Sequence, residues 1–261
     1  MRFSELCELI KKEEVNKLEA LFHHEPYLRD LVNKEGLTLP WICAQNNHTQ
    51  GMLLFIKENF DCNEIINSST VFHKAAECGS LDVLKVLLEY KPDALKLKNR
   101  GGDTLLHTAC FNDKVEVVQF LLQPHLNVEL NVTNKFACSP LHYACEENRI
   151  QVVELLLMQP GIDVNVRHKY GDTPLHKACR NNHVKVVSML IKQKNIDVNI
   201  RNKNKQYADD LTEDRNIKRM INKITQTKPR DQDKEWQSTL TFNFIVIHRF
   251  NSYVLPMIVD Y

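Results

Sequence analysis

Apolar residues recur along much of the chain at the spacing of one helix face. In the stretch 171–200, Val184, Val187, Leu190 and Ile191 return at intervals of three and four residues. This periodicity is typical of an amphipathic helix, and polar residues separate it from a shorter apolar run, PLHKAC, just before it. The pattern predicts two short helices in close succession.

The residues around these two runs indicate where each helix begins and ends. Thr173 suits an N-cap and Pro174 the first helical position, while the preceding Gly-Asp pair suits a turn. Asn182 tolerates the left-handed backbone that would separate the first helix from the second. The segment Ile196 to Ile200 alternates apolar and polar residues, so we expect a short extended arm there.

The same pattern repeats along the chain. The segment ACSPLHYACEENRIQVVELLLMQPGIDVNV at 137–166 aligns without a gap with 171–200, at a period of 34 residues. Looser copies begin at Ser69 and Gly102, and an earlier copy carries Trp41 where the others carry histidine. One such unit cannot bury its apolar face alone, so neighbouring units must stack. The aligned histidines are His73, His107, His142 and His176.

These units resemble the ankyrin repeat, whose first helix begins with T-P-L-H-x-A. TPLHKA at 173–178 matches this signature completely, and SPLHYA at 139–144 nearly so. The resemblance implies an all-α repeat solenoid of stacked helix-turn-helix units with β-turn or hairpin loops, about six repeats including degenerate caps. The units run to 34 or 35 residues rather than the usual 33, which predicts enlarged loops after the second helices.

We divide the chain on this frame. The expected units are a degenerate N-terminal capping repeat (1–32), a divergent repeat (33–66), four repeats (67–98, 99–132, 133–166 and 167–200), a C-terminal capping repeat (201–224) and a linker with an apolar tail (225–261). The tail LTFNFIVIHRFNSYVLPMIVDY shows no repeat feature. A strand pair, a docking peptide, an aggregation-prone end and a gene-model artefact are its open alternatives.

Charge and composition narrow the range of partners. Thirty-four Lys and Arg residues nearly balance 33 Asp and Glu residues, so no overall field would recruit nucleic acid or an anionic membrane. The chain lacks a signal-peptide pattern and any apolar run of membrane-spanning length. We expect a monomeric protein of the cytoplasm or nucleus, whose eight cysteines are free thiols.

Three H-x-x-C pairs on the first helices could in principle hold a metal. We interpret them as structural, because each cysteine takes a repeat position that Ala44 or Ala76 occupies elsewhere, where it would be a small buried apolar residue. The resemblance implies that the histidines hydrogen-bond between adjacent repeat loops. With no catalytic triad and no phosphate-binding loop, we expect no enzyme activity, cofactor or metal. The pairs are His107 with Cys110, His142 with Cys145 and His176 with Cys179.

The remaining candidate for function is a surface. Ankyrin arrays usually bind proteins on the concave side, formed by turn tips and the exposed face of each first helix. The matching turn-tip residues are Arg100, Asp103, Lys135, Phe136, Lys169, Tyr170 and Asp172, and the matching helix residues include Phe111, Asn112, Tyr143, Glu146, Lys177 and Arg180. Aromatic and Arg side chains favour protein interfaces. Some aromatics could instead pack on neighbouring turns, less so Tyr143 than Phe136 and Tyr170.

We therefore predict a non-catalytic scaffold or adaptor that binds a partner protein. The alternative is the recognition module of a larger enzyme or channel, for which the apolar tail is the only support.

Overall fold

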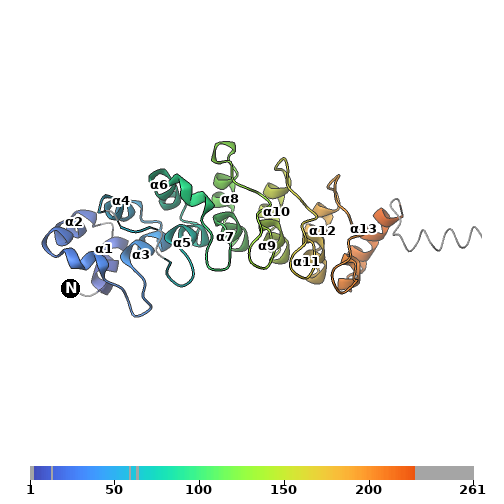
Figure 1. Ribbon diagram of the computed structural model, residues 1–261, viewed down its shortest axis with the longest axis horizontal. Coiled ribbons are helices and arrows are strands. Elements are labelled where there is room, and N and C mark those ends of the chain that lie inside the picture. The colour runs from blue at the N-terminus through green and yellow to red at the C-terminus, as the bar shows by residue number, and fades with distance from the viewer. Residues whose placement is uncertain (1–2, 13, 59, 63–64, 227–261) are drawn as a thin grey trace, which may run out of the picture.

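The computed structural model describes residues 3–12, 14–58, 60–62 and 65–226. Over these residues the chain forms a single elongated row of helix pairs, running from the N-terminus at one end to α13 at the other (Figure 1). The predicted all-α array of stacked pairs is confirmed. The apolar tail, with its open alternatives, lies outside the described residues.

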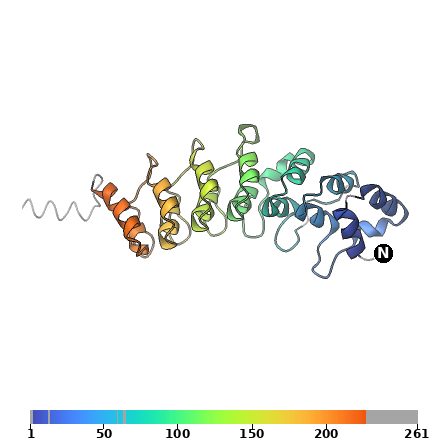
Figure 2. The same ribbon diagram turned by 180° about the vertical axis from the view of Figure 1, so that it is seen from behind.

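The helix pairs form two layers. We call the first helix of each pair inner and the second outer, and each inner helix packs against the next inner helix along the row. The inner helices are α3 (Leu39–Gln45), α5 (Val71–Cys78), α7 (Leu105–Phe111), α9 (Pro140–Glu146) and α11 (Pro174–Arg180). The outer helices are α4 (Thr49–Lys57), α6 (Leu81–Tyr90), α8 (Val115–Leu121), α10 (Ile150–Leu157) and α12 (Val184–Leu190). The view from behind shows the same two layers (Figure 2).

A further unit closes each end of the row. At the N-terminal end, α1 (Phe3–Lys11) and α2 (Val15–His24) pack on α3 and α4. At the other end, a short 3-10 helix, η4 (Ala208–Leu211), takes the inner position on α11, and α13 (Arg215–Thr225) covers α12. Only Ile217 and Ile221 of α13 are fully buried, so its other face meets water. Repeat arrays need such polar ends.

The core runs through the whole row and is built from the same positions in each unit. In α9, for example, Leu141, Ala144 and Cys145 are fully buried, and Val152 and Val153 of α10 face them. Small residues on the inner helices let the layers approach closely. Stability therefore comes from contacts between neighbours rather than from any one unit.

The inner helices begin and end as the sequence pattern predicts. Thr173 caps α11 and accepts a hydrogen bond from the His176 amide, with Pro174 in the first turn. Asn182 then has a φ of 57°, the left-handed break before α12. Gly171 has a φ of 81° in the preceding turn.

The outer loops differ from the expected extended arms. In the part of the chain that the structure describes, two isolated β-bridges occur and no strand, and neither bridge lies in Ile196 to Ile200. Asparagine side chains join neighbouring loops instead. Asn131 donates to the carbonyl of Gly161 (2.8 Å) and accepts from the amide of Asp163 (2.9 Å). Asn165 repeats both bonds with Asn195 and Asp197.

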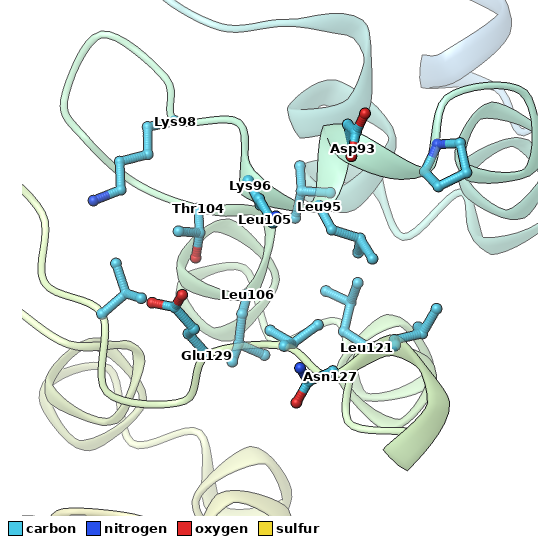
Figure 3. Close-up of a pocket in the computed structure, with 14 residues that line it drawn as sticks. Asp93, Leu95, Lys96, Lys98, Thr104, Leu105, Leu106, Leu121, Asn127 and Glu129 are labelled. Carbon is cyan, nitrogen blue, oxygen red and sulfur yellow. The ribbon is translucent and has the colours of Figure 1, made fainter.

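Other outer loops contain short 3-10 helices, namely η1 (Pro26–Asp30), η2 (Pro92–Lys96) and η3 (Pro124–Leu126). A pocket of about 330 Å³ lies between η2 and η3, with Leu95, Leu106 and Leu121 projecting into it and Asp93 and Glu129 at its edge (Figure 3). None of the turn-tip residues predicted to bind a partner lines it.

Candidate partner-binding surface

Four histidines tie each inner turn to the next. Each Nδ1 lies 2.8 to 2.9 Å from the hydroxyl of the Ser or Thr that begins its own helix. Each Nε2 lies 2.9 to 3.2 Å from a backbone carbonyl in the following turn. The contact expected between adjacent repeat loops is therefore present four times. The carbonyls belong to Asp103, Cys138, Asp172 and Gln206.

These contacts require neutral histidines. The Nδ1 of His142 accepts the backbone N–H of Ser139 (3.0 Å), which leaves Nε2 to donate to the carbonyl of Asp172. A proton on Nδ1 would face that N–H. Burial lowers the pKa of His142 to about 4, and burial likewise lowers the pKa values of His73, His107 and His176.

The H-x-x-C pairs have packing roles. Cys110, Cys145 and Cys179 are fully buried in the core, and both ring nitrogens of each paired histidine already have hydrogen-bond partners. Burial raises the pKa of Cys179 to about 12, so its thiol stays protonated. Within the described ranges no three His, Cys, Asp or Glu side chains are grouped to hold a metal ion.

The inner turns are closed by asparagine side chains. Asn134 accepts the amides of Phe136 (2.9 Å) and Cys138 (3.0 Å), and Asn202 does the same for Asn204 and Gln206. In the turn between them His168 takes this place, and its Nδ1 accepts the amide of Asp172 (2.9 Å). The residues at the tips of these turns point outward, which leaves Phe136 57% and Tyr170 64% exposed. The turns thus present two aromatic rings to solvent.

A hollow of about 450 Å³ lies between these two rings and the inner helices. Tyr143 lies on its wall from α9, and Lys177 and Arg180 lie there from α11. The hollow thus unites eight predicted residues from two turns and two helices: Phe136, Tyr143, Glu146, Lys169, Tyr170, Asp172, Lys177 and Arg180.

Charges on the wall of this hollow are arranged in pairs. Lys177 Nζ lies 2.9 Å from Glu146, and Arg180 Nη1 lies 2.7 Å from Asp172. Asn202 also donates to Asp172 (2.8 Å). Burial alone would raise the pKa of the Asp172 carboxyl, but the bonds from Arg180 and Asn202 outweigh it and hold the pKa below its usual value. Two of the cations are therefore held in place before any partner arrives.

Asp172 corrects one sequence expectation. It was placed among the exposed turn-tip residues, but its side chain is 2% exposed. Gly171 turns the chain so that the next side chain points inward, where Arg180 and Asn202 satisfy it. Asp172 thus positions Arg180 and is not available to a partner.

A second hollow, of about 420 Å³, lies one repeat earlier along the same surface, with Asp103, Phe111, Asn112 and Tyr143 on its wall. The rings of Phe111 and Tyr143 meet edge to face at 5.4 Å. The Tyr143 hydroxyl accepts from Asn134 (2.8 Å) and lies 3.3 Å from Asp103. Burial, and then the Asp103 carboxylate, raise the pKa of Tyr143, so its hydroxyl keeps its proton.

Tyr143 also reverses an expectation. It was expected to pack on neighbouring residues less than Phe136 and Tyr170 do, yet it is the one held by Phe111 and Asn134. A tyrosine on a helix can reach the previous turn, whereas the two turn-tip rings stay mostly exposed, with Tyr170 meeting the His168 ring of its own turn edge to face at 5.6 Å. Tyr143 separates the two hollows.

Two predicted residues line neither hollow. Arg100 and Lys135 are exposed on their turns, and their backbone N–H groups bond to the carbonyls of Ser68 (2.8 Å) and Gly101 (3.1 Å). Sequence reasoning missed Asn134, Asn202 and Lys203. The signal for them was the repeat frame itself, which places an Asn or His before a basic residue in successive turns.

The described residues contain no helix long and apolar enough to cross a bilayer. The surface offers aromatic rings, paired charges and open hollows, a combination suited to binding another protein.

The comparisons with known proteins agree with this architecture. The chain matches the family described as Ankyrin repeats (3 copies) over residues 6–96, 41–134, 90–168 and 126–202. It is 32% identical over 120 residues to the probable 26S proteasome regulatory subunit p28 of Saccharomyces cerevisiae. That match spans 44% of this chain and 52% of the yeast protein, so the chain spans about half the length of this relative.

A solved structure shows the same fold. It is the crystal structure of the ankyrin repeat domain of Bcl-3, a member of the IkappaB protein family. The TM-score is 0.67 at 24% identity, over 81% of this chain and 95% of that one. From its repeat motif, its stacked helix pairs and the family match over most of its length, the chain belongs to the ankyrin-repeat family.

Proposed function

We propose that this chain is a non-catalytic scaffold that binds a partner protein through the surface formed by its inner turns and inner helices. The observation that carries the proposal is the hollow between Phe136 and Tyr170. Two large rings stand exposed at neighbouring turn tips above it, and nothing in the described residues fills it. Buried aromatic and Arg side chains are the usual centres of protein interfaces.

The binding residues of this proposal are the predicted positions without the buried Asp172, twelve in all, and their roles differ. Phe136 and Tyr170 are the exposed anchors, and Arg180 and Lys177 are cations held by their neighbours. A partner that buries these groups would meet a surface already in its binding geometry, which reduces the entropy lost on association. The full set is Arg100, Asp103, Phe111, Asn112, Lys135, Phe136, Tyr143, Glu146, Lys169, Tyr170, Lys177 and Arg180.

The similarity to a probable 26S proteasome regulatory subunit supports a more specific partner. We propose that the partner is a protein of the 26S proteasome, with the chain acting in the cytoplasm or nucleus as a monomer. The alternative of a recognition module within a larger enzyme or channel rested on the apolar tail, and no described residue favours it.

A pull-down of purified 26S proteasome on the immobilised chain would test both the proposed surface and the proposed partner. The wild type should retain proteasome, and the variant Phe136→Ala with Tyr170→Ala should retain at least about tenfold less, because an anchor ring typically contributes 1 kcal/mol or more. The matched control is Tyr90→Ala with Met158→Ala, which removes two exposed apolar side chains from the outer layer.

The outcomes separate the two claims. Equal retention by all three proteins would show that the inner surface is the wrong site. No retention by the wild type would reject the proteasome as partner, and a screen of other proteins with the same three variants would then decide whether the surface binds.

A further inference from the structure

Three of the predicted positions and one residue that the sequence did not single out form a row of basic side chains on the inner turns. Arg100, Lys135, Lys169 and Lys203 occupy the same place in four successive turns, which we call the basic row. In each, the backbone N–H donates to a carbonyl of the preceding turn, at 2.8 to 3.1 Å. The backbone therefore fixes all four in register.

The side chains of the basic row are available. All four residues are exposed, and in the described part of the chain none of the four forms an ion pair. Lys177 and Arg180, by contrast, lie lower on the same surface and are already paired. What distinguishes these four positive charges is that they recur at the same turn position in four consecutive units.

The spacing of the row follows from the stacking of the helices. Packed helices lie about 8–10 Å apart, so successive row residues are about 10 Å apart along the array. An extended chain rises about 3.3 Å per residue and reaches this distance in three residues. A helix rises about 1.5 Å per residue and reaches it in seven.

From this geometry we propose that the basic row binds an acidic protein segment lying along the array, with carboxylates repeating every third residue if extended or every seventh if helical. The inference rests on the proposed function and adds the chemistry of the partner. Phe136 and Tyr170 directly follow Lys135 and Lys169, so the segment should carry apolar side chains beside its carboxylates.

A nucleic acid fits the same surface less well. Glu77 and Asp103 line one hollow, and Glu146 lines the other, so partly exposed carboxylates accompany the row. A phosphate backbone with a charge at every nucleotide would meet these carboxylates. An acidic protein segment can place uncharged residues opposite them.

Two labelled peptides would test the proposal by fluorescence anisotropy. One is an alanine-based helix with Glu at every seventh position, and the other a threonine-rich extended peptide with Glu at every third. Each has a Glu→Gln counterpart. The row variant carries Lys135→Ser, Lys169→Ser and Lys203→Ser. The control carries Lys185→Ser, Lys192→Ser and Lys194→Ser, which removes the same charge from exposed positions on and after α12.

We expect at least one Glu peptide to bind the full chain and its Gln counterpart to bind more weakly. The row variant should bind about tenfold more weakly than wild type, since each exposed ion pair contributes about a factor of two. The control should match the wild type. Raising the salt concentration should weaken wild-type binding and affect the row variant less. Circular dichroism should show that all variants fold, because only the backbone of the row residues bonds within the array.

Three results would overturn the proposal. The first is that neither Glu peptide binds the full chain at low salt. The second is that the row and control variants weaken peptide binding equally. The third is that a single-stranded oligonucleotide binds through the row more tightly than either peptide. Each of these would leave the proposed function standing if the Phe136 and Tyr170 variant still loses its protein partner.

Discussion

At the scale of single residues, the repeated histidines are the main polar contacts of the array. Each one caps its own helix through Nδ1 and bonds the next turn through Nε2, so a single side chain serves both the helix and the stacking. The backbone amide at the start of the inner helix also has a side-chain acceptor in the closing unit, which lacks the histidine. In the closing unit, Asp210 Oδ2 accepts the Tyr207 amide (2.8 Å), which reproduces the contact that His142 Nδ1 makes with Ser139.

The buried histidines predict a loss of stability in mild acid. Their pKa values in the folded chain lie below about 6.5, the value expected when unfolded. As the pH falls below about 6.5, these histidines become protonated in the unfolded chain but stay neutral in the folded chain. The free energy of unfolding therefore decreases until the pH falls below the histidine pKa values of the folded chain. Each such histidine should contribute about 1.4 kcal/mol per pH unit in this window.

Urea unfolding between pH 7.5 and 5 measures this slope. His142→Gln should lower the stability at pH 7.5 and reduce the slope by about one proton. The exposed His125 serves as the control, and His125→Gln should leave both unchanged. An identical slope in the two variants would show that the repeat histidines do not govern acid sensitivity.

At the scale of elements, the inner turns work because their backbones come close together. Gly102 has a φ of 83°, and a Cβ there would lie 2.9 Å from the backbone nitrogen of Lys135 in the next turn. The bond from Lys135 to Gly101 depends on this approach. Only glycine satisfies both the conformation and the contact.

Gly102→Ala should therefore destabilise the array by more than backbone strain alone. The matched control is Gly161→Ala, whose φ is 85° but where a Cβ meets nothing within 4 Å. We expect about 1 kcal/mol for Gly161→Ala, and about 2–3 kcal/mol for Gly102→Ala because the turns must separate. Urea denaturation gives both values, and equal losses would contradict the role of close approach.

At the scale of the whole molecule, each unit contacts only its neighbours, so a substitution in one unit should destabilise that unit and its neighbours rather than the whole array. The closing helix α13 rests on α12 mainly through the buried Ile217 and Ile221. Its other face, which carries Arg215, Arg219 and Lys223, is exposed. The C-terminal unit should therefore open independently of the middle of the row.

Ile221→Ala should raise amide hydrogen exchange in α13 and α12 while leaving α5 to α8 unchanged. The cavity left behind should destabilise the end of the array by about 2–4 kcal/mol. Lys223→Ala, on the exposed side of the same helix, is the control. Uniformly raised exchange along the row would indicate that the array unfolds as one cooperative unit instead.

The sequence alone determined the repeat frame and the helix pairs, because these follow from short-range periodicity and from residues that recur at each unit. The histidine contacts between turns were expected only from the resemblance to ankyrin repeats. The tertiary structure decided which side chains remain free. Asp172 and Tyr143 were expected to be exposed, but the first turns inward to Arg180 and to Asn202 of the next unit, and the second packs on Phe111 of the preceding unit. Likewise the basic row emerges only when the turns stack, since residues about 34 positions apart in sequence become neighbours about 10 Å apart in space.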